Sequence, residues 1–471
     1  MKSLTVRLDP DIDPMAIGAR SGLLRSRRQA DDPVPALAGI GQAVGLSVER
    51  PGGAAAAQAA LSELEGQNDV GGSGTGPVAF AAFPFDRQAS GRLVVPEIVV
   101  GRGADGRRWL TIVGDGSLSV DDALDRARAV AGGAGDRAEP AEPARFDLRS
   151  SLAPEVWRDE VVAAARDRIR SGQLDKVVLA RELVLETDQP IRPEAVIAAL
   201  ADTFPAAIVF NVDGFLGASP ELLVSRHGDV VRAHPLAGTA PRSSDPAVDG
   251  RLAAGLLSST KDQWEHRITI EWLLENLLRY CSYVDAEPEP TIVSLANVHH
   301  LGTRVEGRLS SPPASVLELA AALHPTPAVG GAPQATALAV IAELEQAERG
   351  RYGGPTGWVD GAGNGAFAVA IRSAQLTGTT PASSPGWGWW PTATRRPSWP
   401  RPAASSGPCW EPSSGPEAGR SEMAEPGGHL LAGVDPGCHP SITGVSSEVQ
   451  NLQREASTAT NSLHRSHSRW P

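Results

Sequence analysis

The sequence predicts a mixed α+β fold, and three observations support this prediction. The chain has 471 residues, enough for two or three ordinary domains or for one large α/β or α+β unit. Short strand-like segments follow one another through tight turns, as at Asp213-Gly214, which favours antiparallel pairing. Segments with apolar residues at helical spacing, such as 154–170 and 261–280, separate these groups of strands.

Composition excludes several classes of protein. The formal net charge is −12 and the isoelectric point about 5.4, so there is no general electrostatic case for nucleic-acid binding. No apolar run is long enough to span a membrane, and the first nine residues turn acidic too soon for a signal peptide. The three cysteines form neither a disulfide framework nor a CxxC pair, so we expect a cytoplasmic protein.

The N-terminal part, residues 1–130, mixes strand-like and helical segments. A buried strand is expected over 76–86, and a hairpin is expected where 92–101 and 108–113 flank Ala104-Asp105-Gly106. Glycine and proline are dense between Gly132 and Pro143. Residues 131–145 are therefore predicted to be an exposed linker that separates two halves of one fold.

The stretch 174–181, LDKVVLAR, opens the most regular part of the chain. It follows the predicted helix 154–170 and a turn at 171–173, and its apolar residues alternate as on one buried face of a strand running to residue 186. Lys176 begins this strand and could direct its amine over the sheet. On position alone, an exposed lysine is the more common outcome.

The segments after it alternate in the same way up to residue 375. Strands are expected over 207–212, 214–219, 221–226, 229–234, 235–239, 351–359 and 365–372, and helices over 261–280 and 333–349. Asp262 and Glu265 lie three residues apart and so share a face of the first helix. The strands also supply a Ser-Pro-Glu glutamate, a Gly-Thr pair and the terminal Arg372. This set suits a carboxylated substrate, which arginine can clamp, and a hard cation such as Mg²⁺.

Eight motifs occur in an order that resembles the chorismate-utilising enzymes, most closely the isochorismate synthases. Each motif is weak alone, but eight in order are specific; the resemblance covers 146–375 well and the N-terminal part loosely. The motifs are KVVLAR (176–181), FLGASPE (215–221), PLAGT (235–239), KDQWEH (261–266), VHHLGT (298–303), HPTPAVGG (324–331), RYGGPTGW (351–358) and AIRSA (370–374).

Three positions separate the members of this family. Aminodeoxychorismate synthases carry a nucleophilic lysine where this chain has Ala237, and anthranilate synthases lack the lysine that stands here as Lys176. Salicylate synthases share the lysine but usually differ at 324–331. The resemblance therefore implies an isochorismate synthase of menaquinone or catechol siderophore biosynthesis. The alternatives are a salicylate synthase and an inactive, chorismate-binding or unstable product.

The resemblance also implies a fold, a mechanism and a site. The fold is that of the aminodeoxychorismate synthases, with two stacked antiparallel sheets, helices outside, and the site between the sheets in a catalytic region 146–376. Lys176 would be the general base for a water that attacks C2 of chorismate, and Glu221 would protonate the departing C4 hydroxyl. The implied Mg²⁺ ligand is Glu265, with Asp262 nearby. The implied substrate contacts are Gly238, Thr239, His300, Tyr352 and Arg372. A monomer is expected.

Each of these residues also has an ordinary structural explanation. A glutamate such as Glu265 on an amphipathic helix usually belongs to a solvated face, and Glu221 could be an ordinary carboxylate at the start of a strand. A histidine such as His300 is more often a hydrogen-bonded core residue than a ligand. Without the ordered motifs, these explanations would be preferred.

The character of the sequence changes after Thr379. Residues 377–471 are rich in Pro, Ser, Gly and Arg and hold six of the 11 tryptophans, whereas the family has a strand like AGVGVV followed by DSDP and ExxETxxK. Because tryptophan has the single codon TGG, reading one nucleotide upstream forces Gly, Val and Ala at 388, 390 and 391 and permits AGVGVVA and then DSDP. We therefore predict a frame slip near Thr380, loss of the C-terminal strands, and a disordered tail. The second Mg²⁺ glutamate of the family would fall at Arg401.

Overall fold

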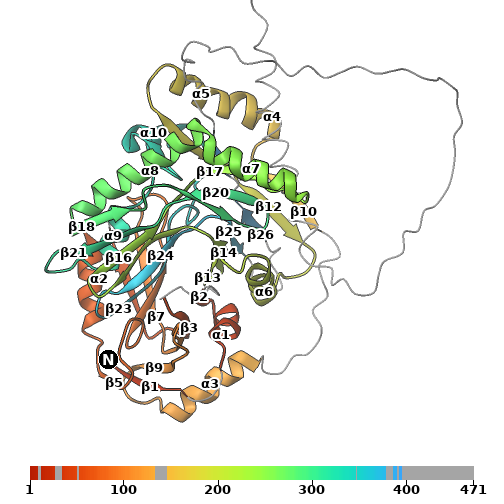
Figure 1. Cartoon of the computed structure of the whole chain (residues 1–471). Helices are drawn as coiled ribbons and strands as arrows, with labels where there is room; N and C mark the ends of the chain where they lie inside the picture. The colour runs from red at the N-terminus through yellow and green to blue at the C-terminus, as the bar shows by residue number, and fades with distance from the viewer. Residues whose placement is uncertain are drawn as a thin grey trace, which may run out of the picture.

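The computed structural model describes residues 1–8, 12–26, 34–49, 52–132, 146–345, 347–377, 386–389 and 392–394. The predicted α+β fold is confirmed: two large sheets stack on each other and helices cover their outer faces (Figure 1). The predicted linker 131–145 lies outside the described residues except at 131–132, which end a helix. In the described part of the chain, no helix is both long and apolar enough to cross a membrane.

Among the described residues, the first sheet has twelve strands. All its pairings are antiparallel except β1 with β5, which run parallel. In spatial order, the strands are β10 (Phe146–Ser150), β12 (Leu183–Thr187), β26 (Gly386–Trp389), β25 (Ser373–Thr377), β14 (Phe215–Ser219), β13 (Ile208–Val212), β2 (Leu23–Ser26), β3 (Ala36–Ile40), β8 (Ile98–Arg102), β9 (Arg108–Gly114), β1 (Lys2–Arg7) and β5 (Gln67–Asn68).

The second sheet has nine strands in the described part of the chain, all paired antiparallel. In spatial order, they are β18 (Cys281–Ala286), β21 (Val305–Leu309), β16 (Val230–His234), β15 (Leu222–His227), β24 (Gly365–Val369), β23 (Pro355–Asp360), β6 (Val78–Ala82), β7 (Gly91–Val95) and β4 (Val44–Val48).

Two small antiparallel sheets complete the strands and carry several of the candidate residues. One contains β22 (Gly331–Ala332), β11 (Lys176–Ala180) and β27 (Thr392–Thr394); the other contains β17 (Leu236–Pro241), β20 (Val298–Gly302) and β19 (Thr291–Ser294).

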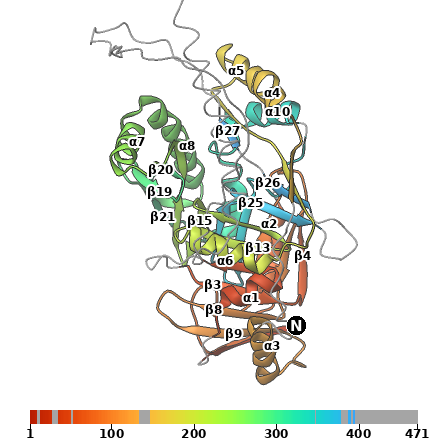
Figure 2. The same cartoon turned by 90° about the vertical axis from the view of Figure 1, so that its right-hand side faces the viewer.

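The helices lie outside the two large sheets. They are α1 (Pro14–Ser21), α2 (Gly53–Ser62), α3 (Val120–Gly132), α4 (Pro154–Val156), the π-helix η1 (Trp157–Val162), α5 (Ala163–Arg170), α6 (Pro193–Thr203), α7 (Pro246–Ser258), α8 (Thr260–Leu278), α9 (Val316–Ala322) and α10 (Gln334–Leu344). Contacts place α1, α3 and α6 on the twelve-stranded sheet, and α2, α8 and α9 on the nine-stranded sheet. The small sheet β17–β20–β19 lies with α7 and α8 on one side (Figure 2). β11 contacts α10.

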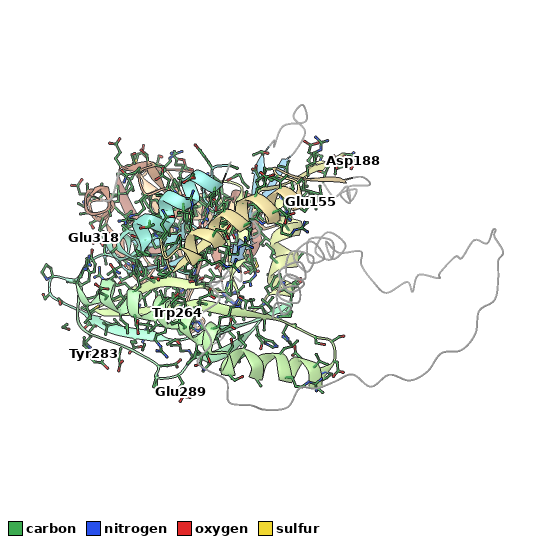
Figure 3. All side chains as sticks on the ribbon, turned by 90° about the horizontal axis from the view of Figure 1, so that it is seen from above. Glu155, Asp188, Trp264, Tyr283, Glu289 and Glu318 are labelled. Carbon is green, nitrogen blue, oxygen red and sulfur yellow. The ribbon has the colours of Figure 1, made fainter. Side chains whose placement is uncertain are left out.

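Apolar side chains fill the space between the two large sheets. Leu37 of the first sheet and Phe80 and Trp358 of the second belong to one buried cluster, and each is fully shielded from solvent. Burial of such large apolar surfaces is the main favourable term in folding. Polar and exposed side chains such as Glu155 and Glu289 lie at the periphery instead (Figure 3).

Two predicted strands prove to be interrupted. The strand predicted over 92–101 divides into β7 and β8, which lie in different sheets, because Pro96 cannot donate the backbone hydrogen bond that a continuous strand needs. The strand predicted over 174–186 divides into β11 and β12, again in different sheets. Lys176 at the start of β11 is only 5% exposed, so the more common exposed position for a lysine is not adopted.

Two predicted ends are also wrong. The helix predicted over 333–349 ends at Leu344, and Arg372 follows β24 in the left-handed region, with φ 52°, and does not end the strand. The fold was expected to end near Gln375; beyond it, β26 pairs with β12 and β25, and β27 pairs with β11, while the boundary of the region 146–376 stays a prediction. The C-terminal strands are therefore present at these two places, while the other residues from 378 on lie outside the described part of the chain. The frame slip itself stays a prediction.

Candidate active site

Lys176 is held at the start of β11 by its neighbour β22. Residues Lys176 and Ala332 pair across the two strands, and the Lys176 carbonyl would lie 2.2 Å from a Cβ placed on Gly331. Gly331 has φ 142°, so only glycine permits this close approach. The HPTPAVGG segment therefore passes directly against the main chain of Lys176.

The amine of Lys176 meets a buried carboxylate. Its Nζ lies 2.9 Å from Oε1 of Glu265, and the two side chains are 6% and 9% exposed. The contact is an ion pair, and Lys176 Nζ makes no hydrogen bond to the described residues. Glu265 comes from α8, so this contact links the strand of Lys176 to the helix of the KDQWEH motif. Glu265 therefore does not lie on a solvated face of the helix, as a glutamate in such a helix usually does.

Glu221 and Arg372 lie where the chain crosses between the two large sheets. Glu221 connects β14 to β15, and Arg372 connects β24 to β25. The N–H of Val369 donates to the Glu221 carbonyl over 3.1 Å, and the N–H of Ala218 donates to the Arg372 carbonyl over 3.2 Å. The two crossings therefore run side by side, which brings an acid and a guanidinium from distant parts of the sequence to one place.

Burial controls the protonation of Glu221. The residue is 2% exposed, and this burial raises the pKa of its carboxyl to about 8, although nearby Lys176 and Arg372 act to lower it. Its Oε1 finds no hydrogen-bond partner among the described residues. At neutral pH the side chain is therefore mostly a neutral acid that can donate a proton.

Arg372, His300 and Thr239 form a chain of contacts. A guanidinium can only donate, so Arg372 Nη2, 2.7 Å from His300 Nε2, makes that nitrogen the acceptor and places the ring proton on Nδ1. Nδ1 lies 3.0 Å from Thr239 Oγ1 and 3.3 Å from the Gly238 carbonyl. Burial, and then Arg372, lower the pKa of His300 to about 3, so the ring is neutral. His300 thus has both nitrogens engaged within the protein.

Tyr352 and Gly238 complete the set of predicted substrate contacts. Tyr352 is 2% exposed and acts electrostatically on Arg372, whose pKa burial lowers to about 10. Gly238 has φ 82°, and a Cβ there would lie 3.3 Å from the Cβ of Asp262. The glycine therefore lets β17 approach α8, the helix that carries Glu265. The predicted residues are gathered at one place, while their roles stay predictions.

Carboxylates for a metal ion are few in the described residues. No group of three or more His, Cys, Asp or Glu side chains there could hold a metal ion. Glu265 offers a hard oxygen ligand, whereas Asp262 accepts a hydrogen bond from Ser259, which caps α8. Mg²⁺ usually takes one or two protein carboxylates together with substrate oxygens, so Glu265 fits a site shared with a substrate. The predicted second ligand position, 401, lies outside the described residues.

Sequence reasoning missed His266, which lies beside Glu265. Its Nε2 lies 2.7 Å from Thr303 Oγ1, so the contact ties α8 to the loop after β20. Burial lowers the pKa of His266 to about 4, which keeps the ring neutral. The KDQWEH motif contains this histidine, and its place directly after the predicted metal ligand was the available signal.

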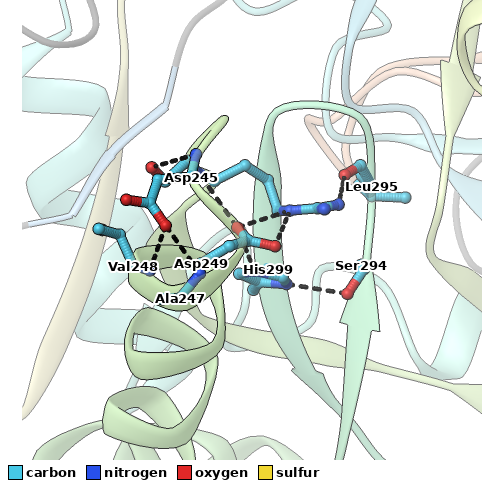
Figure 4. A network of polar contacts seen from close by, with 9 residues as sticks. Asp245, Ala247, Val248, Asp249, Ser294, Leu295 and His299 are labelled. Atoms are coloured by element: carbon cyan, nitrogen blue, oxygen red, sulfur yellow. Dashed lines mark hydrogen bonds and ion pairs between the residues drawn. The ribbon is translucent and has the colours of Figure 1, made fainter.

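A second polar network stabilises the loops behind β20 (Figure 4). Arg242 donates to both carboxylate oxygens of Asp249 over 2.9 and 3.0 Å, and His299 Nε2 lies 3.0 Å from Oδ1 of the same carboxylate. His299 Nδ1 lies 2.8 Å from Ser294 Oγ, across the β19–β20 hairpin. The network therefore fastens α7 to the strand that carries His300.

Replacing Asp249 by asparagine is expected to lower the melting temperature at pH 7 by about 2–4 °C. Hydrogen bonds from Arg242 and the Ser243 amide hold the pKa of Asp249 below its ordinary value of 3.8. A carboxyl with a lowered pKa stabilises the fold above its unfolded pKa, and this contribution is lost as the pH falls below about 4. The difference between wild type and D249N should therefore shrink between pH 5 and pH 3 in thermal melts.

The matched control for this prediction is Asp245→Asn. Asp245 caps the same helix through the amides of Ala247 and Val248, and asparagine is an equally good cap. The control therefore removes one charge nearby but keeps the bonds. Equal losses of melting temperature in D249N and D245N would contradict the role of the network.

The site contains a buried amine, a neutral carboxylic acid, a guanidinium and a carboxylate that could bind a metal ion. Acid–base chemistry on an anionic substrate requires groups of these kinds. The family profile of chorismate binding enzymes matches residues 4–383. The chain therefore belongs to the chorismate-binding enzymes.

Several relatives support this placement. The chain is 36% identical over 310 residues to isochorismate synthase DhbC of Bacillus subtilis, which covers 64% of this chain and 71% of that protein. It is 33% identical over 334 residues to isochorismate synthase EntC of Escherichia coli, covering 68% and 79%. Both of these relatives are isochorismate synthases.

Solved structures agree on the fold. The crystal structure of a putative 2,3-dihydroxybenzoate-specific isochorismate synthase, DhbC from Bacillus anthracis, matches with a TM-score of 0.64 and 29% identity, over 80% of this chain and 90% of that chain. Escherichia coli MenF, a menaquinone-specific isochorismate synthase, matches with a TM-score of 0.67 and 22% identity, over 83% and 88%. The second likeness concerns the fold alone.

Proposed function

We propose that this chain is an isochorismate synthase, which converts chorismate to isochorismate with the help of Mg²⁺. The observation that carries the proposal is the opposed pair of Lys176 and a protonated Glu221, whose pKa burial raises to about 8. Isomerisation by addition of water at C2 and loss of the C4 hydroxyl needs a base and an acid at once. The product would enter menaquinone or catechol siderophore biosynthesis.

Each side chain has a role in this proposal. Lys176, with its amine deprotonated, takes the proton from the attacking water, and Glu221 gives its proton to the departing hydroxyl. Arg372 clamps a substrate carboxylate with its guanidinium, and Gly238, Thr239 and Tyr352 would make further contacts with the substrate. His300 would act mainly by orienting Arg372, because both of its ring nitrogens are already engaged. Glu265 would hold Mg²⁺, which neutralises substrate carboxylate charge.

Product identification tests the proposal. Purified protein, chorismate and Mg²⁺ are incubated with and without an added isochorismatase, and the products are separated by chromatography. Isochorismate in the absence of the second enzyme supports the proposal; salicylate without any added lyase would identify a salicylate synthase. Chorismate binding without turnover, measured by calorimetry, would identify an inactive chorismate-binding protein.

Activity is expected to fall as the pH rises through about 8. Glu221 donates its proton only while it is neutral, and its raised pKa keeps it neutral below about 8. The value of kcat/KM should therefore decline above this pH, and Glu221→Gln should lower kcat by about 10²–10⁴-fold. The pH profile of the coupled isochorismatase assay measures both effects.

Glu155→Gln is the matched control, since Glu155 is exposed on α4 (Figure 3). It should leave both kcat and the pH profile as in wild type. A Glu221→Gln variant with wild-type kcat would show that another group supplies the proton.

A further inference from the structure

Arg349 and Glu345 form a buried ion pair that no step of the proposed reaction uses. Their side chains are 2% and 3% exposed. Arg349 Nε donates to Glu345 Oε2 over 2.8 Å, and Nη2 donates to Oε1 of the same carboxylate. The Arg349 guanidinium also lies over the ring of Phe85, 4.1 Å from its centroid. Burying such a pair is favourable only when its remaining hydrogen-bonding groups are also satisfied.

The remaining groups of this pair bond to the main chain around Lys176. Arg349 Nη2 donates to the Val178 carbonyl over 2.7 Å, and the Ala180 amide donates to Glu345 Oε1 over 2.7 Å. These residues lie two and four positions after Lys176 on β11. Arg349 Nη1 donates to the carbonyl of Val329 over 2.8 Å. One guanidinium thus spans β11 and the HPTPAVGG segment that pairs with it.

We propose that Arg349 and Glu345 are a positioning pair that fixes β11, and through it the amine of Lys176, relative to the 324–331 segment. This inference rests on the proposed function, because it concerns the base of that reaction. The backbone bonds of the pair and the β22 pairing constrain β11 from Lys176 to Ala180. A displacement of about 1 Å in a catalytic group can cost about 10²-fold in rate.

Only arginine can supply this arrangement. Its planar fork donates to two oxygens of one carboxylate and still reaches two carbonyls, whereas a lysine ammonium carries its donors at a single point. Arg349→Lys therefore keeps the charge and the ion pair with Glu345 but loses part of the link between Val178 and Val329. Glu345→Gln keeps the shape and an acceptor for the Ala180 amide while removing the charge.

Arg226 provides the matched control. It is a second buried arginine, 8% exposed, and it donates to the carbonyls of Gly228, Ala314 and Gly363. None of these partners lies on β11 or in the 324–331 segment. Arg226→Lys therefore makes the same chemical change in the same fold at a comparable burial, away from Lys176.

The first test compares steady-state kinetics of the three variants with the melting temperatures of the same preparations. Arg349→Lys and Glu345→Gln should lower kcat for chorismate isomerisation by about 10–10²-fold, with KM within about threefold of wild type. Arg226→Lys should keep the wild-type kcat even if its melting temperature falls as far as that of Arg349→Lys. If Arg226→Lys lost as much kcat as Arg349→Lys at an equal loss of melting temperature, the proposal would be overturned. The pair would then be a structural element only.

The second test needs no turnover. Amide hydrogen exchange, read by mass spectrometry on the wild type and each variant, should rise in peptides covering 174–181 and 326–332 of Arg349→Lys. In Arg226→Lys it should rise instead near 226–228 and 314. Unchanged exchange at 174–181 in Arg349→Lys overturns the proposal. A wild type that turns over no chorismate refutes the proposed function alone, and the exchange result then still decides whether the pair fixes β11.

Discussion

Lys176→Ala is expected to abolish measurable isochorismate formation. The substitution removes the proposed base, and a well-placed base contributes about 10²–10⁴-fold to a rate. It also removes the amine that lies 2.9 Å from Glu265, so the buried carboxylate loses this ion pair. The loss should appear in kcat, measured with excess isochorismatase, at saturating chorismate and Mg²⁺.

Two further variants make this expectation decisive. Lys2→Ala removes an exposed lysine from β1, which belongs to a different sheet from β11, and should keep wild-type activity. Breaking a buried pair can cost about 3–5 kcal/mol of stability. If Lys176→Ala does not fold, Lys176→Arg, which keeps the charge, is assayed in its place. Turnover in a folded Lys176→Ala above about a tenth of wild type would exclude Lys176 as the base.

The second large effect concerns the C-terminal segment. Restoring the predicted frame, so that residues 381–402 read ARLxAGVGVVADSDPAAELAET, is expected to raise both the yield of folded protein and its Mg²⁺-dependent activity. The family match ends at residue 383, close to the predicted slip. The backbone of β26 falls on the restored GVGV, and that of β27 falls on the restored DSD.

The position of β26 explains the expected size of the effect. This strand pairs with β12 on one side and β25 on the other, so it is interior to the twelve-stranded sheet. Its loss would leave β12 and β25 with unpaired edges, and the restored segment supplies valine, which favours strands. β27 pairs with Val178 to Ala180 on β11, so the restored segment also adjoins the strand of the proposed base.

The metal site provides the second part of the expectation. Restoration places glutamate at position 401, where the present chain has Arg401, and so changes the local charge by two units. Charges a few ångströms apart interact by a few kcal/mol at an effective dielectric of about 20, so Mg²⁺ affinity should rise by about 10²-fold or more. A restored chain that carries alanine at 401 distinguishes the effect of the carboxylate from that of the restored strands. It should fold as well as the fully restored chain but bind Mg²⁺ weakly.

Three measurements check this prediction. Isothermal titration gives the Mg²⁺ affinity of the present and restored chains, the coupled assay gives their activities, and the nucleotide sequence across codons 376–405 tests the frame directly. Comparable activity and affinity in the two chains would show that residues 377–471 are a genuine extension.

The sequence alone determined the class of fold and the choice of candidate residues. Turn residues such as Asp213-Gly214 and Asp105-Gly106 predicted two hairpins correctly. The positive φ that such turns need depends on the residue types in the turn itself. Motifs spread from Lys176 to Arg372 identified the family, which the comparisons confirm. Apolar spacing located most helices and strands, because each buries one face.

Tertiary structure decided what depends on contacts between distant segments. Lys176 became buried because Gly331 admits a neighbouring strand, and Glu221 became a neutral acid because two chain crossings enclose it. The helix predicted through Arg349 ended early so that this residue could reach the backbone of β11. Local pattern cannot show such outcomes, since burial and long-range hydrogen bonds override the preferences of a single segment.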